Sequence, residues 1–121
     1  MDAFYSLVNL ENLYMPLIKL SIIRQDTFRH LNKCDSLILT DSGVNEIEPN
    51  AFDGLQSLTK LALNNNFIRL LRNFSFQSLI NLLDLDLSNS NIEIIEPNAF
   101  IGLTSLTRLL INTNRLLFLL H

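Results

Sequence analysis

Residues 57–92 read SLTKLALNNNFIRLLRNFSFQSLINLLDLDLSNSNI, and this stretch carries one apolar pattern twice. Apolar residues stand at Leu58, Leu61, Leu63 and Ile68, and the same spacing returns 24 residues later from Leu82 onward. A fixed period of roughly 20–50 residues is the sequence signature of a repeat architecture. The stretch therefore predicts a stack of similar structural units.

The 24-residue frame extends over the whole chain, with frame starts at 10, 34, 58, 82 and 106. We number the positions within a frame as columns. Columns one, four, six, eleven, fourteen, nineteen and twenty-two are apolar in every frame, Cys34 included, and column nineteen is always phenylalanine: Phe4, Phe28, Phe52, Phe76 and Phe100. Chance would not place apolar residues at all of these positions in a chain that is 48% hydrophobic. We predict a single domain over residues 1–121 with about five repeats.

The spacing within each frame predicts where the strands lie. Side chains alternate between the two faces of a strand, so columns four and six point to one face and column five to the other. One such strand per repeat can pair with the next at about 4.8 Å, giving a parallel sheet. The phenylalanine of column nineteen and the leucine of column twenty-two then return to cover the inner face of that sheet.

The pattern LxxLxLxxNxIxxIxxxxFxxLxx resembles the leucine-rich repeat family, and it is most similar to the typical repeats of Toll-like receptors and matrix proteoglycans. Residues 46–58 (EIEPNAFDGLQSL) and 94–106 (IIEPNAFIGLTSL) carry that signature most fully. The resemblance implies an α/β fold: a right-handed solenoid, or horseshoe arc, with a parallel sheet on its concave face. It also implies irregular or short helical turns on the convex side, and an extracellular or cell-surface location.

In the resembled family, an asparagine in column nine hydrogen-bonds the backbone of adjacent repeats. Asn66 and Asn114 match this position, while Ser42 and Ser90 can do part of the same work, because buried backbone groups need partners. Ile18 cannot, so the first repeat is expected to be less regular.

A 48-residue period lies on top of the 24-residue one. The segment EPNAF occurs at 48–52 and again at 96–100, which indicates duplication of a two-repeat unit. Column fifteen alternates in charge, and stacking would bring its residues into one row: Arg24, Glu48, Arg72 and Glu96. We interpret this row as structural, since exposed ion pairs contribute only about 0–1 kcal/mol each.

Composition excludes several classes of function. The net charge is −3 and the basic residues are dispersed, from which we predict no nucleic-acid partner. No apolar run approaches the roughly 20 residues of a membrane span, and residues 1–10 do not read as a signal peptide. Neither end has a recognisable cap, and residues 116–120 are all apolar. We therefore expect a piece of a longer array, with uncapped ends that could drive self-association.

The sequence predicts no catalytic, metal or cofactor site. His30 and His121 stand apart from Cys34, which occupies a core column and is expected to be a buried apolar residue. No cluster of cysteine or histidine has the spacing of a metal site. Asn73 begins the glycosylation sequon Asn73-Phe74-Ser75, although chance alone would supply such triplets in this composition. We predict that the chain is not an enzyme.

The outward-facing strand positions are where ligand recognition would have to lie. We predict an apolar patch and a charged patch there, and we include Asp41 from column eight on the same face; the candidate residues are Tyr14, Leu17, Ile38, Asp41, Lys60, Asp84, Asp86 and Arg108. The favoured function is a scaffold for a protein or glycan ligand, within an extracellular or receptor protein. The alternative is a structural or self-associating repeat fragment without a dedicated ligand.

Overall fold

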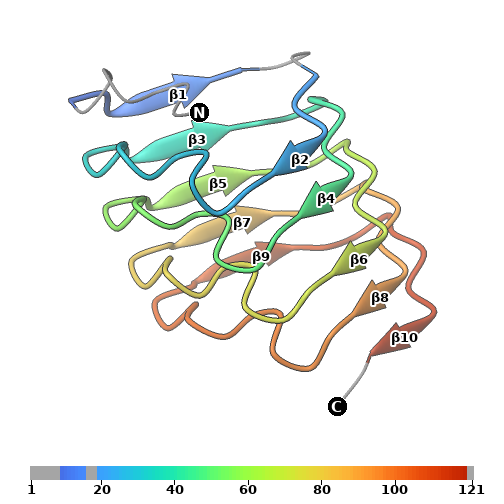
Figure 1. The fold of residues 1–121 in the computed structure, drawn as a ribbon. Helices are drawn as coiled ribbons and strands as arrows, with labels where there is room; N and C mark the ends of the chain where they lie inside the picture. Colours follow the sequence, from blue (N-terminus) through green and yellow to red (C-terminus); the bar gives the residue numbers. More distant parts are fainter. Residues whose placement is uncertain (1–8, 16–18, 120–121) are drawn as a thin grey trace.

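The computed structural model describes residues 9–15 and 19–119 and shows a solenoid built around a five-stranded parallel sheet (Figure 1). Its strands contain three residues each and follow chain order, β1-β3-β5-β7-β9. Their bounds are β1 (Asn12–Tyr14), β3 (Ser36–Ile38), β5 (Lys60–Ala62), β7 (Asp84–Asp86) and β9 (Arg108–Leu110). The predicted parallel-sheet solenoid is confirmed.

The register of the sheet reproduces the repeat frame. Leu37 pairs with Leu61, and Leu61 pairs with Leu85, each step advancing 24 residues. These column-four side chains are buried, while columns three and five form the outer surface of the sheet, which we call the strand face. Every repeat therefore presents two variable side chains at equivalent places on that face.

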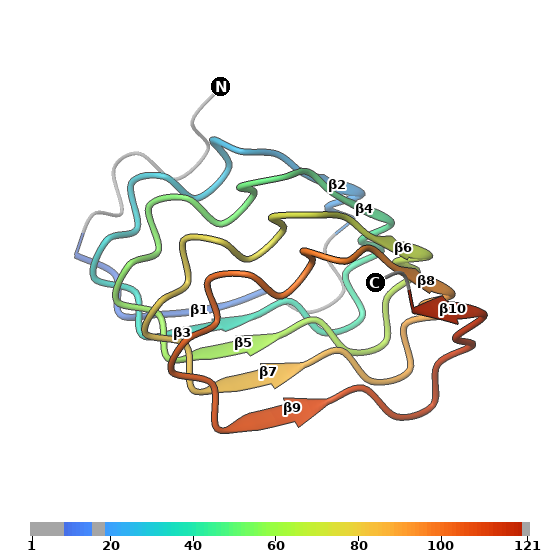
Figure 2. The ribbon, with the colours of Figure 1, turned by 90° about the horizontal axis from the view of Figure 1, so that it is seen from below.

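A second set of short strands lies on another side of each turn (Figure 2). They contain two residues each: β2 (Ile22–Ile23), β4 (Glu46–Ile47), β6 (Leu70–Leu71), β8 (Ile94–Ile95) and β10 (Phe118–Leu119). β2 pairs with β4, while β6, β8 and β10 form a separate three-stranded sheet. All of these pairings are parallel, as a stack of translated repeats requires.

The return segments contain turns, and no helix occurs in the described part of the chain, so the expected short helical turns are not supported. The hydrogen bonds show why. The amide of Ala51 donates to Glu48 O and that of Leu55 donates to Phe52 O, each closing a single turn. Asn50 and Gly54 have positive φ angles of 61° and 97°, which interrupt any continuous helical ladder.

Column nineteen forms the central column of the core. Phe28, Phe52, Phe76 and Phe100 stack in sequence, with ring centroids 6.2, 5.7 and 6.2 Å apart and interplanar angles of 2°, 13° and 7°. Phe4, the remaining member of the column, lies outside the described residues. Parallel rings at these separations fit the offset stacking that aromatic pairs favour.

Column nine makes the predicted contacts between repeats. Asn66 Oδ1 accepts from the amides of Ser42 and Val44, both at 3.0 Å, and Asn66 Nδ2 donates to Leu39 O and Leu63 O. Asn114 repeats this arrangement one 48-residue unit later. Ser42 and Ser90 bond backbone carbonyls of the preceding repeat, at Met15 and Leu63. Ile18 lies outside the described residues.

The predicted charge row forms only in part. Arg24 pairs with Glu48 at 3.4 Å, but Arg72 pairs with Glu46 and not with Glu48 or Glu96. Glu48 and Glu96 also share a second role, because each accepts a hydrogen bond from a backbone amide of the preceding repeat, that of Gln25 or Asn73. In these two repeats the glutamate carboxylate therefore serves as a hydrogen-bond acceptor for the turn of the preceding repeat, and the alternation of charge is a secondary effect.

Burial of the core columns declines in the last turn. Leu61 and Leu85 are fully buried, but their column-four equivalent Leu109 is 40% exposed, and Leu116 is exposed as well. Among the described residues, a neighbouring repeat packs against this turn on one side, and these predicted core residues are not covered on the other. No helix long and apolar enough to cross a bilayer occurs among the described residues.

Candidate ligand-binding face

The strand face contains a hollow of about 460 Å³ that all five repeat strands line, mainly with side chains from columns three and five. It is lined by Tyr14, Ile38, Thr40, Lys60, Leu61, Ala62, Asp84, Asp86, Arg108 and Leu110. Parallel pairing fixes this convergence, because Lys60, Asp84 and Arg108 are register partners on successive strands. A second row of partners runs from Tyr14 through Ile38, Ala62 and Asp86 to Leu110.

The hollow has an apolar end and a charged end. Tyr14 is 69% exposed and lies in the same row as Ile38. At the other end Arg108 Nη1 lies 3.6 Å from Asp84 Oδ2, and Asp86 Oδ1 accepts hydrogen bonds from the amide and hydroxyl of Ser88. Lys60 forms no ion pair with any described residue. Its exposed ammonium is therefore available to an incoming anion.

Six of the residues predicted from the sequence line this hollow: Tyr14, Ile38, Lys60, Asp84, Asp86 and Arg108. Asp41 does not; it lines a separate hollow beside the loops that follow the strands. Leu17 lies outside the described residues. Sequence reasoning did not select Thr40, Ala62 or Leu110 as binding residues, although the strand period places the last two in the same row as Asp86.

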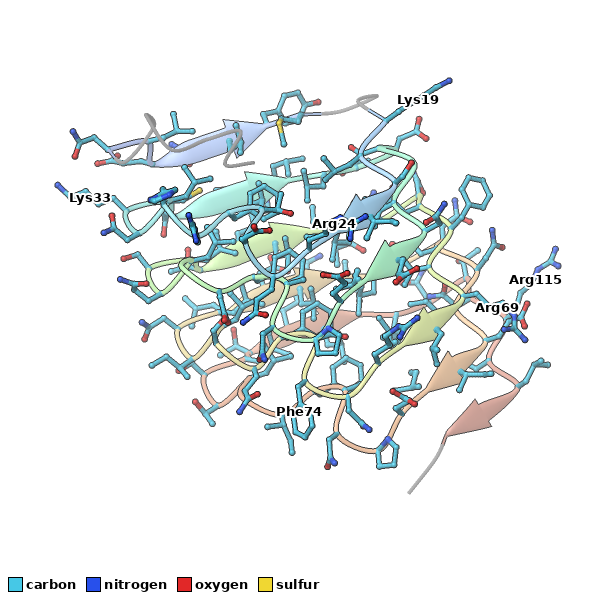
Figure 3. All side chains as sticks on the ribbon, viewed as in Figure 1. Lys19, Arg24, Lys33, Arg69, Phe74 and Arg115 are labelled. Atoms are coloured by element: carbon cyan, nitrogen blue, oxygen red, sulfur yellow. The ribbon has the colours of Figure 1, made fainter. Side chains whose placement is uncertain are left out.

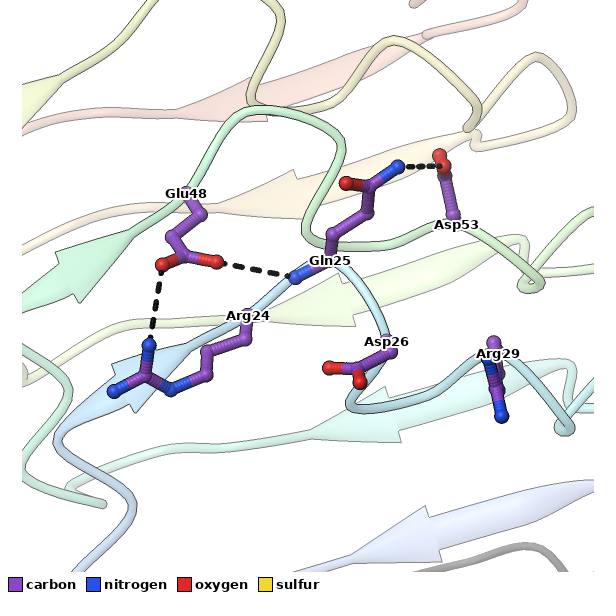
Figure 4. A pocket seen from close by; sticks show the side chains of 6 residues that line it. All are labelled: Arg24, Gln25, Asp26, Arg29, Glu48 and Asp53. Atoms are coloured by element: carbon purple, nitrogen blue, oxygen red, sulfur yellow. Dashed lines mark hydrogen bonds and ion pairs between the residues drawn. The ribbon is translucent and has the colours of Figure 1, made fainter. Parts of the chain in front are cut away.

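A third hollow, of about 520 Å³, lies on the return side of the first two described repeats (Figure 4). Three of its charged groups, those of Arg24, Glu48 and Asp53, already form contacts within the hollow. Glu48 binds both the guanidinium of Arg24 and the amide of Gln25, and the side chain of Gln25 bonds Asp53. Because a ligand would have to compete with these contacts, we prefer the strand face as the candidate site.

Asn73, the sequon residue, is half-buried on the return side. Its Oδ1 accepts a hydrogen bond of 2.7 Å from the amide of Asn98, and its own amide donates to Glu96. Ser75 is fully buried and its hydroxyl donates to Arg72 O. Attachment of a glycan would have to occur before these contacts form, and glycosylation remains a prediction.

Few side chains in the described part of the chain are suited to act as a nucleophile or as a metal ligand. Burial raises the pKa of the Cys34 thiol, which is fully enclosed and donates to Ser36 O. A buried thiol with a raised pKa supplies little of the nucleophilic thiolate at neutral pH. No group of three or more His, Cys, Asp or Glu residues that could hold a metal ion occurs among the described residues.

Several basic side chains extend away from the body of the solenoid (Figure 3). Arg69 and Arg115 point outward from one edge, and Arg69 pairs with Glu93 at 2.9 Å. Lys19, Arg24 and Lys33 lie elsewhere in the same view. Positive charge is thus spread over several surfaces, as the sequence predicted.

Comparison with known proteins identifies relatives of the fold. A family model described as a BspA type leucine rich repeat region matches residues 1–116 in six copies. Toll-like receptor 9 of the horse (Equus caballus) is 41% identical over 46 residues, which is 38% of this chain and 4% of the receptor. A crystal structure of a TLR13–ssRNA13 complex superimposes with a TM-score of 0.77 at 28% identity, covering 94% of this chain and 21% of that one.

These comparisons overturn one expectation from the sequence. The prediction that nucleic acid is excluded as a partner is wrong, because the similar TLR13 structure is a complex with single-stranded RNA. Net charge alone does not exclude a nucleic-acid partner, since a few cations on one face can suffice for a local contact. The chain spans a small share of both relatives, about 4% of one and 21% of the other.

Proposed function

Because the chain belongs to the BspA-type leucine-rich repeat family, we propose that it is a rigid, non-catalytic scaffold that binds a protein ligand through its strand face. The observation that supports this most is the convergence of six variable side chains, from five successive repeats, on one hollow. The similarity to Toll-like receptors favours an extracellular or lumenal receptor segment as the setting.

The composition of the hollow favours protein as the ligand. An exposed tyrosine and aliphatic neighbours at one end, with two acids and two bases at the other, match the mixture of aromatic anchor and polar rim found in protein interfaces. A rigid sheet also loses little conformational entropy on binding, which favours affinity.

The division into five repeats starting at 10, 34, 58, 82 and 106 belongs to the same proposal, because it assigns one pair of face residues to each repeat.

The test compares capture of secreted and cell-surface proteins by the wild-type chain with capture by two variants, Tyr14→Ala and Asp86→Arg. We expect to capture a ligand whose affinity is reduced about tenfold or more in each of the two variants, as it is when hot-spot residues are truncated. Gln56→Ala, exposed and outside the hollow, is the matched control. Circular dichroism verifies folding of all three. Ligands that bind the face variants as tightly as the wild type would refute the site.

Single-stranded RNA is a second candidate ligand, favoured by the TLR13 complex and by the presence of Lys60 and Arg108 on the hollow. RNA binding would require phosphate contacts, and its affinity would fall steeply with salt. Fluorescence anisotropy with a short labelled RNA, at two salt concentrations, measures this directly. If RNA is the ligand, Lys60→Ala and Arg108→Ala should each weaken binding and reduce its salt dependence. Binding that both variants retain would exclude this face as the RNA site.

A further inference from the structure

A separate hollow of about 310 Å³ lies beside the loops that follow strands β3, β5 and β7. We call it the amide hollow. It is lined by Asp41, Asn65, Asn66, Phe67, Asn89 and Asn91. Asn66 is buried and engaged with the backbone, so the groups available to a ligand are the carboxylate of Asp41, three amides and one aromatic ring.

The backbone holds the polar side chains of this hollow in a regular row. Asp41, Asn65 and Asn89 occupy column eight of successive repeats and all have left-handed φ angles, of 56°, 60° and 53°. The amide of each donates to a carbonyl of the next repeat, at 3.1, 3.1 and 3.0 Å. Asn and Asp tolerate this conformation better than other residues with side chains. The row is therefore fixed in place before any ligand arrives.

The amides are paired with each other but not saturated. Asn89 Nδ2 donates to Asn65 Oδ1 at 2.8 Å. This leaves Asn89 Oδ1 as an acceptor and Asn65 Nδ2 as a donor, with no hydrogen-bond partner among the described residues. Neighbouring repeats are about 4.8 Å apart. One free donor and one free acceptor therefore stand on adjacent repeats, where two hydroxyl groups of one extended ligand can reach them.

Phe67 adds an apolar surface to this polar row. Its side chain is 63% exposed, and its backbone amide is held by Val44 O at 2.9 Å. An exposed phenylalanine beside hydrogen-bonding amides offers a flat face for the C–H groups of a ring, while the amides reach its polar edge.

The charge of the lining decides between classes of ligand. It contains one acid, Asp41, and no base. Arg69, which is near in sequence, is paired with Glu93. A phosphate or sulfate group would meet Asp41 without a compensating cation, whereas a neutral hydroxyl-rich ligand can donate to that carboxylate. We propose that the amide hollow is a binding site for neutral carbohydrate, distinct from the strand face.

Titration calorimetry tests this with three defined probes: maltohexaose, cellohexaose and chitohexaose. We expect at least one to bind saturably, and Phe67→Ala to weaken that binding by about tenfold, as loss of one aromatic contact does. Asn89→Gly and Asn91→Gly should also weaken it, because glycine keeps the left-handed backbone and removes only the amide. Phe67→Trp should retain the affinity.

Two controls separate this site from the proposed function. Thr113→Gly changes a column-eight residue with φ 57° outside the hollow, and Tyr14→Ala changes the strand face; neither should alter sugar affinity. The proposal is overturned if no probe binds at about 10 mM, or if Phe67→Ala and Asn89→Gly leave the affinity unchanged. It is also overturned if dextran sulfate or single-stranded RNA binds this hollow in preference, as judged by loss of their binding in Phe67→Ala.

Discussion

Asn66 shows how much of the fold depends on single polar residues. Fully buried, it accepts from two backbone amides and donates to the carbonyls of two repeats. Ser90, in the same column, donates to Leu63 O and accepts a weaker bond from the amide of Asn66. Asn66 therefore provides hydrogen-bond partners for the backbone of the preceding repeat. Ser90, from the following repeat, in turn accepts a bond from the backbone of Asn66.

Replacing Asn66 by Ala should therefore cost about 3–5 kcal/mol, because it leaves several buried backbone groups without partners. Ser90→Ala removes fewer bonds and should cost about 1 kcal/mol. Urea denaturation followed by circular dichroism measures both. Equal losses for the two variants would contradict the different roles of asparagine and serine in this column.

Phe74 is a strained residue on the return side. It is a bulky, non-glycine residue with φ 65°, whereas its column equivalent one repeat earlier, Asn50, has φ 61° with a side chain suited to that conformation. Phe74 is also 37% exposed, so packing offsets only part of this strain.

Phe74→Asn should be more stable than Phe74→Ala by about 1 kcal/mol, since both truncate the ring but only asparagine tolerates the left-handed backbone. Thermal unfolding of the two variants at equal concentration measures the difference. An alanine variant as stable as the asparagine variant would show that the backbone at this position relaxes.

At the scale of elements, the 48-residue period has a steric explanation. Column twenty-one holds Gly54 and Gly102 in two repeats but His30 and Ser78 in the two others. A Cβ at Gly54 would overlap the backbone of Arg29, and one at Gly102 the backbone of Gln77. The glycine repeats approach their predecessors closely, and the alternation marks a two-repeat unit.

Gly54→Ala should destabilise the chain by about 3 kcal/mol or more, because a backbone overlap cannot be relieved by a rotamer change. Ser78→Ala in the same column is the matched control. Its hydroxyl is buried without a hydrogen-bond partner in the described structure, so its removal should be neutral or stabilising. Melting temperatures that fall equally for both variants would contradict this account.

At the scale of the whole molecule, the periodic columns were readable from the sequence because each of them has one structural role. The strand register and the shared place of the phenylalanines follow from spacing, whereas the bonds of Asn66 were expected from the resemblance to leucine-rich repeats. The amide hollow was not predicted, because Phe67 and Asn91 share a column with Gly43, and their role depends on loop geometry. The partner of Arg72 was missed for the same reason: the side chain reaches Glu46, one repeat back and two columns away from the expected row.

A solenoid also predicts that the cost of one substitution depends on its repeat. Each repeat contacts only its neighbours, so an internal repeat has two interfaces and a terminal one has a single interface. Column four allows a comparison between the two kinds of repeat with the same residue type. Leu61 in an internal repeat is 1% exposed, and Leu109 in the last repeat is 40% exposed. Both residues lie at the centre of a three-residue strand, in β5 and β9.

Leu61→Asp should unfold the chain or lower its stability by about 4 kcal/mol or more, because it buries a charge without a partner between two repeats. Leu109→Asp should cost about 1–2 kcal/mol, since its carboxylate can remain in water. Urea titration monitored by circular dichroism, together with hydrogen exchange of individual amides, measures both the size and the extent of the loss. In Leu109→Asp the amides of β3 and β5 should keep their protection while those of β9 lose theirs. Uniform loss of protection along the chain would show that the repeats unfold as one cooperative unit, and it would refute nearest-neighbour coupling in this stack.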